Sequence, residues 1–413
     1  MKSLTGYISE AAGKNTHMTH IEDLILDGGV KGARQAINAL RSLRDMLSGN
    51  SKKSVDITVK WDGAPAVFAG EDPRDGSFFV AKKGIFNANP KIYKSHEDIK
   101  ADTSGDLTKK LILAFDELQK LGIKGVIQGD FMFDNSDLKK ETINGINHIV
   151  FHPNTIAYTV PADSALAKEI RAAKIGIVWH TIYNGSTFET MQAEFGREIV
   201  PKLKKTKSVW MVDATLPDLS GTATLTAKET EAVTKNLSEA GKLFKQIASS
   251  TLKEIEQNKE LNMLINVYNN SKVRDGQRVT NTKKHATGLV MWVNNRYAKE
   301  IDKRSSPKGK QTQIDKRDEL LKFFSKGNIK NLQKIFEMQN FVVDSKLIII
   351  NKLNKLSNIG TFVKTKSGFK VTNPEGFVAI DRMEGGAVKL VDRMEFSANN
   401  FSKDIIKGWD NPN

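Results

Sequence analysis

Strand patterns flank a long helical segment in this sequence, and that order constrains the fold more than any other feature. Apolar runs typical of strands occupy residues 55–190 and return between residues 360 and 396. Between them, apolar side chains recur at helical spacing from Leu237 to Ile265 and from Leu320 to Phe336. Because the two strand regions need a common core, the sequence predicts an α+β fold with a large helical insertion.

These patterns divide the 413 residues into three parts. Residues 1–50 are expected to form an N-terminal helical segment, in which apolar residues follow helical spacing and are interrupted at "DGGVKG". Residues 51–200 and 359–413 are expected to form the sheet-containing core. Residues 201–358 are expected to form a basic helical insertion that binds nucleic acid.

The excess positive charge of the chain lies in the helical segment. The net charge is +15, and residues 201–370 hold 33 Lys and Arg against 16 Asp and Glu, whereas the remainder holds 30 against 32. A basic segment beside a neutral remainder suits binding to a phosphate backbone. A solvated, lysine-rich helical surface is the ordinary structural alternative.

Cysteine and long apolar runs are both absent from the sequence. Without cysteine the chain can form no disulfide, no zinc–thiolate cluster and no cysteine nucleophile. No apolar run approaches the roughly 20 residues of a membrane helix, and the first residues lack the apolar centre of a secretory signal. We expect a soluble, cytoplasmic monomer that has no membrane partner.

The stretch "VKWDGAPAVFAG", residues 59–70, presents a lysine at the end of a strand. Apolar residues at 55, 57 and 59 alternate with polar ones, so Lys60 is expected on the accessible face. Asp62 and Gly63 follow at once, and a K-x-D-G string alone is a weak signal. It gains weight from the motifs that follow in order: "AKKG" (81–84), "VIQGDF" (126–131), "IGIVWH" (175–180), "EGFV" (375–378) and "VKLVDR" (388–393).

This ordered set resembles the motifs of the ATP-dependent ligases and capping enzymes, the lysine nucleotidyltransferase superfamily, and is most similar to those of phage RNA ligases. The resemblance covers residues 55–200 and 360–396 and implies a nucleotidyltransferase core of ATP-grasp-like antiparallel sheets with flanking helices. In that family the lysine of K-x-D-G attacks the α-phosphate of ATP and forms a lysyl-AMP. The AMP moves to a polynucleotide 5′-phosphate, and a 3′-hydroxyl then displaces it.

The resemblance implies a catalytic role for three residues. Lys60 matches the nucleophile that carries AMP, and Asp62 completes the first motif together with Gly63, which is expected beside the nucleotide. Lys389 matches the fifth-motif lysine at the α-phosphate, although the family usually has K-x-K there. Val391 occupies the second lysine position in this sequence, and Arg393 is the candidate substitute for that lysine.

The resemblance also implies contacts to ATP and Mg²⁺. Lys83 matches the basic residue that contacts phosphate, and Asp130 the third-motif carboxylate near the ribose, where the family usually has Glu. Trp179 matches the aromatic residue that stacks on adenine, although an aromatic residue on a strand is often simply part of the core. Glu375 matches the fourth-motif carboxylate, and with Asp130 it is expected to hold the metal.

These expectations lead to an ATP- and Mg²⁺-dependent polynucleotide ligase, an RNA ligase, with RNA or DNA ends as partners. DNA ligases and capping enzymes carry an OB-fold after the fifth motif, and only about 20 residues follow it here. A DNA nick ligase and a non-catalytic nucleic-acid-binding protein on a decayed core remain open alternatives, the latter because of Ile380 and Val391. Nucleic-acid contacts are expected from the polar, basic loop that contains Lys303, Arg304, Lys308 and Lys310.

Overall fold

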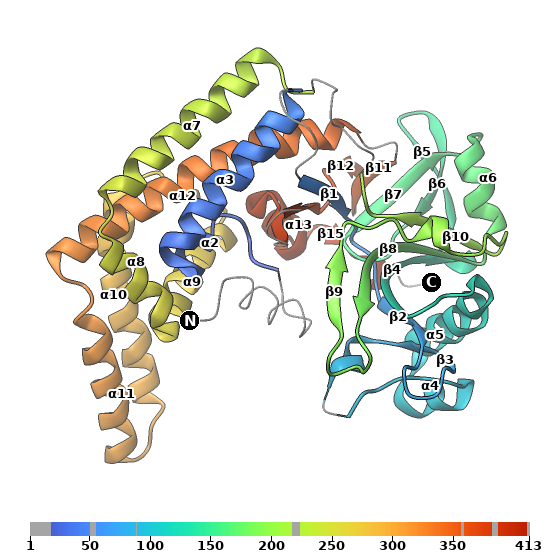
Figure 1. Ribbon diagram of the computed structural model, residues 1–413, viewed down its shortest axis with the longest axis horizontal. Helices are drawn as coiled ribbons and strands as arrows, with labels where there is room; N and C mark the ends of the chain where they lie inside the picture. Colours follow the sequence, from blue (N-terminus) through green and yellow to red (C-terminus); the bar gives the residue numbers. More distant parts are fainter. Residues whose placement is uncertain are drawn as a thin grey trace.

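Three β-sheets lie on one side of the molecule and a group of long helices lies on the other (Figure 1). The computed structural model describes residues 18–49, 55–87, 89–216, 224–356, 359–381 and 387–410. We call the sheets and the short helices around them the sheet lobe, and the helices of residues 24–47 and 227–353 the helical lobe. The fold is α+β, with mainly antiparallel sheets and flanking helices, which confirms the predicted class.

The first six-stranded sheet forms the centre of the sheet lobe. Its strands are ordered β10 (Val209–Asp213), β8 (Ile175–Asn184), β4 (Val126–Asp134), β2 (Ala66–Glu71) and β3 (Phe78–Ala81), and β9 (Gln192–Phe195) also pairs with β8. Only β10 and β8 are parallel among these pairs of described strands. Helices α4 (His96–Asp102) and α5 (Gly105–Leu118) pack their apolar residues against this sheet.

The second six-stranded sheet packs against the first through an aromatic core. Its strands are ordered β12 (Gly368–Val371), β11 (Gly360–Thr365), β7 (Ile156–Pro161), β6 (Ile146–Phe151) and β5 (Lys139–Ile143), and β15 (Ile405–Ile406) pairs with β11. Phe133 of β4 contacts Phe151 of β6 with ring centroids 5.0 Å apart. Helix α6 (Ala165–Ala172) adds its buried face to the same core.

A three-stranded sheet joins distant parts of the chain. Its strands are β1 (Val55–Lys60), β13 (Gly376–Asp381) and β14 (Ala387–Leu390), with β13 in the middle. Apolar residues of all three strands belong to the core of the helical lobe, among them Ile57, Phe377 and Leu390. This sheet therefore holds the two lobes together, and it brings the end of β1 beside the start of β13.

The helical lobe is built from eight helices in the described part of the chain. They are α2 (Leu24–Asp27), α3 (Gly29–Leu47), α7 (Ala227–Gln246), α8 (Ser249–Gln257), α9 (Lys259–Arg274), α10 (Thr282–Asp302), α11 (Pro307–Leu321) and α12 (Lys326–Leu353). Helix α13 (Arg393–Phe401) follows β14 and packs on α9. No described helix combines the length and the apolar character needed to cross a membrane.

Short 3₁₀ helices and glycine turns connect these elements. The 3₁₀ segments are η1 (Lys83–Phe86), η2 (Gln119–Leu121), η3 (Asn135–Asp137), η4 (Val200–Lys202), η5 (Asn354–Leu356) and η6 (Gly408–Asp410). The sequence "EDPRDG" (71–76) forms the hairpin turn between β2 and β3, and Gly76 adopts φ +73° there. The expected interruption at "DGGVKG" separates α2 from α3 where Gly29 adopts φ +52°. Glycine is favoured at both positions because other residues rarely adopt a positive φ.

The predicted domain division differs from the structure in two respects. Residues 201–216 do not begin the helical insertion, because β10 is part of the first sheet and the first long helix starts at Ala227. The N-terminal helices are not a separate segment either, since Leu40 and Leu43 of α3 share a core with Leu237 of α7. Helical spacing identifies the apolar face of a helix but not the element that packs on it. The partner of α3 is α7, about 190 residues later in the sequence.

Candidate functional site

A cavity of about 560 Å³ opens between the three-stranded sheet and the first six-stranded sheet. Seven residues selected from the sequence line it: Lys60, Asp62, Gly63, Lys83, Asp130, Glu375 and Lys389. They come from β1 and the loop after it, η1, β4, the loop before β13, and β14. Side chains more than 300 positions apart in the sequence therefore face one space.

Strand pairing places Lys60 against Glu375. Lys60 is the last residue of β1 and lies opposite Gly376, the first residue of β13, in the antiparallel register. Its Nζ donates a hydrogen bond to Oε2 of Glu375. The Lys60 side chain remains 28% exposed and that of Glu375 only 11%. The amine is therefore accessible from the cavity while its carboxylate partner is largely covered.

Burial shapes the protonation of the groups around Lys60. Desolvation raises the pKa of Glu375, and the positive charge of Lys60 opposes that rise. Lys389 lies opposite Val378 in the β13–β14 pair, and burial, followed by repulsion from Lys60, lowers its pKa. Lys83 acts on Lys389 in the same direction. Three lysines thus concentrate positive charge around one largely buried carboxylate, which is an environment suited to an anionic ligand.

The loop after Lys60 is held by a network centred on Asp62. Its Oδ1 accepts from Asn154 Nδ2 at 2.6 Å, and its Oδ2 accepts from the backbone N–H groups of Thr155 at 2.8 Å and Ile156 at 2.9 Å. The Asp62 N–H in turn donates to the hydroxyl of Tyr158 at 2.7 Å. Burial raises the pKa of Asp62, and these hydrogen bonds oppose the rise. Asp62 therefore acts as a positioning residue that fixes the strand end.

Gly63 allows the same loop to approach β4 closely. A Cβ atom at this position would lie 2.6 Å from Cβ of Asp130 and 2.8 Å from the sulfur of Met132. Both distances are far below van der Waals contact, so a side chain at Gly63 would displace the loop or Asp130. The glycine of the K-x-D-G string thus has a packing reason that does not depend on any resemblance.

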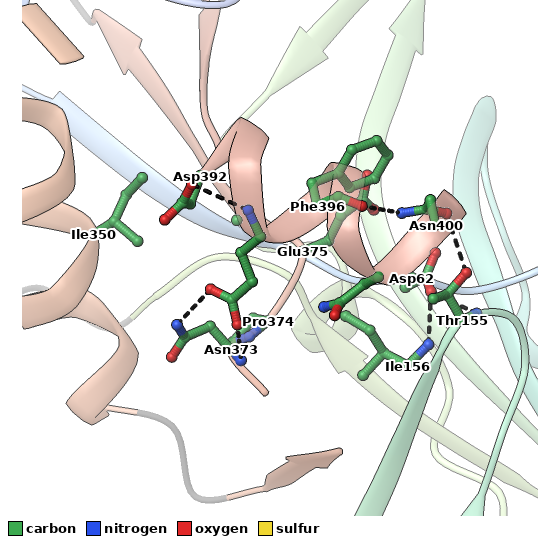
Figure 2. Close-up of a pocket in the computed structure, with 13 residues that line it drawn as sticks. Asp62, Thr155, Ile156, Ile350, Asn373, Pro374, Glu375, Asp392, Phe396 and Asn400 are labelled. Carbon is green, nitrogen blue, oxygen red and sulfur yellow. Dashed lines mark hydrogen bonds between the residues drawn. The ribbon is translucent and has the colours of Figure 1, made fainter. Parts of the chain in front are cut away.

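The loop that carries Glu375 is tied to α13. Oε1 of Glu395 accepts from Thr372 Oγ1 at 2.9 Å and from the backbone N–H of Asn373 at 3.0 Å. Its Oε2 accepts from Asn373 Nδ2 at 2.7 Å. A recess of about 20 Å³ is lined by Glu375 of this loop and by Asp62 and Ile156 (Figure 2). Phe396 and Asn400 of α13 also line the recess. Helix α13 therefore positions Glu375 on one side of the recess and borders the larger cavity with Phe396.

Asp130 faces the cavity from β4 and has an unpredicted neighbour. Nε2 of His180 lies 3.7 Å from Oδ1 of Asp130, and the two side chains are 26% and 19% exposed. His180 follows Trp179 in β8, and Phe195 of β9 lines the same cavity. Alternation along β8 could have pointed to His180, because successive side chains face opposite sides of a sheet.

Trp179 does not lie in the cavity. Its side chain is completely buried in the core beneath the first sheet, together with Ile177 and Ile127. The predicted stacking of Trp179 on adenine does not fit this position, and the core alternative does. Arg393 is likewise absent from the cavity lining, because its Nη1 donates to Asp23 Oδ1 at 2.9 Å. It therefore does not replace the lysine that is missing at position 391.

The four basic residues expected to contact nucleic acid lie far from the cavity. Lys303 and Arg304 follow α10, and Lys308 and Lys310 belong to α11. The α10–α11 hairpin is at the end of the helical lobe most distant from the sheets (Figure 1). All four side chains are exposed, and Lys303 pairs with Glu300 at 2.8 Å. The structure thus separates these residues from the seven cavity residues.

No group of three or more His, Asp or Glu side chains in the described ranges is arranged to hold a metal ion by itself. Both carboxylates of the predicted metal pair, Glu375 and Asp130, line the cavity. Mg²⁺ is commonly held by one or two carboxylates together with phosphates and water. The donor set therefore fits an ion that binds with a phosphorylated ligand better than a permanently caged one.

Comparison with known proteins identifies a family whose function is unknown. No curated protein and no solved structure matches the chain. A family model with the description "Family of unknown function (DUF6267)" matches residues 15–405, which is nearly the whole sequence. The chain therefore belongs to the DUF6267 family.

Proposed function

We propose that this protein is a lysine nucleotidyltransferase that acts as an ATP-dependent polynucleotide ligase on RNA ends. The observation that carries the proposal is the accessible amine of Lys60 bonded to the buried carboxylate of Glu375, in a cavity also lined by Lys389 and Lys83. A nucleophilic lysine, cations for the phosphates and a carboxylate for a metal are what nucleotidyl transfer needs. In this proposal the sheet lobe corresponds to a nucleotidyltransferase core.

The first step would form a covalent lysyl-AMP. The neutral amine of Lys60 attacks the α-phosphorus of ATP, an N–P bond forms, and the P–O bond to the β-phosphate breaks. Pyrophosphate leaves with the bonding electrons, and the proton lost by the amine passes to Glu375, whose pKa is raised by burial. Lys389 and Lys83 stabilise the charge that develops on the phosphates.

The second and third steps would return Lys60 to its starting state. An oxygen of a polynucleotide 5′-phosphate attacks the phosphorus of the lysyl-AMP, the N–P bond breaks, and the amine regains its proton. A 3′-hydroxyl then attacks the 5′-phosphorus and loses its proton to solvent, and AMP leaves with the electrons of the broken phosphoanhydride bond. A bound Mg²⁺ would neutralise phosphate charge, with Asp130 as a protein ligand throughout and Glu375 as a second ligand only while its carboxylate is ionised.

Phe195 and His180 would take the place assigned to Trp179. Both side chains line the cavity and are partly exposed, whereas Trp179 is completely buried. An aromatic face that borders a cavity can stack on a base, and an imidazole can donate or accept a hydrogen bond. We assign base stacking to Phe195 and a polar contact near Asp130 to His180.

The test is covalent labelling by ATP that carries a radioactive α-phosphate. Protein is first stripped of bound AMP with pyrophosphate, then incubated with Mg²⁺ and labelled ATP and denatured. We expect label on the natural chain and none on Lys60→Arg, because a guanidinium is not neutral at working pH. Lys82→Arg is the matched control: Lys82 pairs with Asp102 at 3.1 Å and does not line the cavity, so its label should remain.

The acceptor is identified in a second stage. Labelled protein is offered 5′-phosphorylated RNA or DNA, and we expect faster transfer of label to RNA. Faster transfer to DNA would favour the nick ligase of the same superfamily. An unlabelled natural chain after stripping would contradict the proposal and leave a nucleic-acid-binding protein without covalent chemistry.

A further inference from the structure

A groove of about 620 Å³ on the helical lobe combines cations with an aromatic surface. It runs between α9 and α10 and is lined by Tyr268, Lys272, Arg278, Lys284 and Trp292, among others. We infer that this groove binds a single-stranded polynucleotide, with Trp292 stacking on a base and the lysines contacting phosphates. The inference rests on the proposed function only in naming this strand as the acceptor.

Two buried aromatic side chains, Tyr268 and His285, support the ring of Trp292 beneath the groove. The ring centroids of Trp292 and Tyr268 are 5.5 Å apart, and Tyr268 stacks on His285 at 4.4 Å. Arg296 lies over the Trp292 ring at 5.5 Å. Trp292 is partly exposed, and its neighbour Met291 is 66% exposed. A supported, partly exposed ring next to a guanidinium is the kind of platform on which unpaired bases stack.

The cations of the groove are available for a ligand. Within the described residues, no carboxylate forms an ion pair with Lys272 or Lys284, whereas Arg278 pairs with Asp344. Lys272 instead contacts the ring of Tyr268 at 5.9 Å. Unpaired lysines beside aromatic rings match a strand that offers phosphates and bases alternately. An acidic peptide would use the lysines but not the exposed indole.

The groove is continuous with elements that border the catalytic cavity. Lys272, Arg278 and His285 also line an adjoining cavity of about 290 Å³, which reaches Asp392 and Arg393 at the start of α13. About one and two turns further along, α13 contributes Phe396 and Asn400 to the lining around Lys60. A strand that occupies the groove can therefore lead toward the cavity, whereas the turn between α10 and α11 lies at the end of the helical lobe most distant from the sheets (Figure 1).

Binding is tested with a fluorescent, 20-nucleotide single-stranded RNA that carries a 5′-hydroxyl, without ATP. Fluorescence anisotropy then reports binding alone. We expect Trp292→Ala to weaken binding about ten-fold, because stacking on an aromatic side chain contributes about 1–3 kcal/mol per base. Trp292→Phe should restore most of the affinity. Since Trp292 is only partly buried, thermal unfolding of both variants verifies that they remain folded.

The salt dependence tests the lysines. Lys272→Gln combined with Lys284→Gln should reduce the slope of log K against log salt concentration by about 1.4, or about 0.7 for each lost phosphate contact. Lys253→Gln with Lys316→Gln is the charge-matched control: both are exposed and neither lines a groove described above. The inference is overturned if the control pair reduces the slope equally, or if Lys303→Gln with Lys310→Gln reduces it more.

Separate readouts distinguish failure of this inference from failure of the proposed function. Labelling of Lys60 by ATP tests the proposed function alone and is followed in the same preparations. Strand binding that depends on Trp292 in a protein that takes no label would support the groove and reject the ligase. Equal binding by Trp292→Ala and the natural chain would reject the groove, as would displacement of the RNA by polyglutamate at equal charge. Single-stranded DNA and duplex RNA, tested in parallel, show which sugar and which strandedness the groove prefers.

Discussion

The junction between the lobes, around Glu22 and Lys346, and the α9–α10 groove both carry many charges, but they differ in how many are paired. The groove leaves Lys272 and Lys284 without a described carboxylate partner, although its Arg278 pairs with Asp344. At the junction, Lys346 Nζ donates to Glu22 Oε1 at 2.7 Å, and the two side chains are 1% and 6% exposed. Burial would raise the pKa of Glu22, but the charges of Lys346 and Arg393 lower it. In the groove, Lys284 is exposed and pairs with no described carboxylate.

This difference separates charges that maintain the fold from charges available to a ligand. A buried ion pair costs much desolvation, and removing one partner leaves the other charge uncompensated. An exposed lysine has little effect on stability and can exchange its counterions for phosphates. Replacing a lysine by an uncharged residue should therefore have a different consequence in each region. At the junction it should lower the stability of the fold, and in the groove it should lower the affinity for the ligand.

The largest effect is expected from Lys346→Met. Breaking the buried pair with Glu22 should lower the free energy of unfolding by about 3–5 kcal/mol. Lys284→Met, the same change in the groove, should stay within about 0.5 kcal/mol of the natural chain. Urea unfolding measures both. Adding Glu22→Gln to Lys346→Met should recover part of the loss, and no recovery would mean that lost packing, not an unpaired charge, causes the destabilisation.

A smaller effect is expected from Asp62→Ala at the end of β1. The change leaves the buried backbone N–H groups of Thr155 and Ile156 without their acceptor, but it also removes a carboxylate whose burial is unfavourable, so the net cost should be about 1–3 kcal/mol. Thr142→Ala removes an exposed hydrogen bond to Asn147 and should change stability by less than about 0.5 kcal/mol. Equal unfolding free energies for the two variants would show that the Asp62 network is dispensable for the fold.

Acid should weaken the junction through His20. Burial lowers the pKa of His20 from 6.5 to about 3, while Glu22 opposes the shift and Arg393, Lys346 and Lys389 add to it. Below pH 6.5 the unfolded chain binds a proton at His20, whereas the folded chain does not bind it until the pH nears 3. The free energy of unfolding is therefore highest above pH 6.5, as far as His20 determines it, and decreases as the pH falls from 6.5 toward 3. At about 1.4 kcal/mol per pH unit, roughly 2 kcal/mol should disappear between pH 6.5 and 5.

His20→Gln isolates this contribution from that of Asp23. Burial raises the pKa of Asp23 to about 6, against the attraction of Arg393, so acid adds stability there and partly masks His20. The variant retains Asp23, so its unfolding free energy should fall less than that of the natural chain between pH 7 and 5. Parallel pH profiles for both proteins would show that His20 does not titrate in this range.

Much of the fold class followed from the sequence, but the partners of its elements did not. Alternation and helical spacing predicted the strands around Lys60 and the long helices, because those patterns reflect burial of one face. The same patterns do not specify what covers that face. The joint core of α3 and α7, and the parallel pairing of β10 with β8, therefore appeared only in three dimensions.

The residues of the candidate site could be predicted from the sequence where they belong to a recognisable motif. Lys60, Glu375 and Lys389 face one cavity because β1, β13 and β14 are neighbours in one sheet. His180 was missed, although alternation along β8 pointed to it, because the resemblance assigned the nucleotide contact to Trp179, whose side chain is buried in the core. The shifts of register between β4 and β8, between Gln128 and Gly129 and again beyond Phe131, are irregularities that a single sequence does not reveal.

The smallest expected effect compares an interior aromatic side chain with one that borders the cavity. Phe195→Leu should raise the ATP concentration for half-maximal labelling between about two-fold and ten-fold, because an aromatic contact contributes about 0.5–1.5 kcal/mol beyond its buried area. Trp179→Phe should leave that concentration unchanged and lower the unfolding temperature, since Trp179 is completely buried. If the two effects are exchanged, Trp179 reaches the nucleotide after all, through a rearrangement of β8 that would bring the interior of the sheet lobe into the cavity.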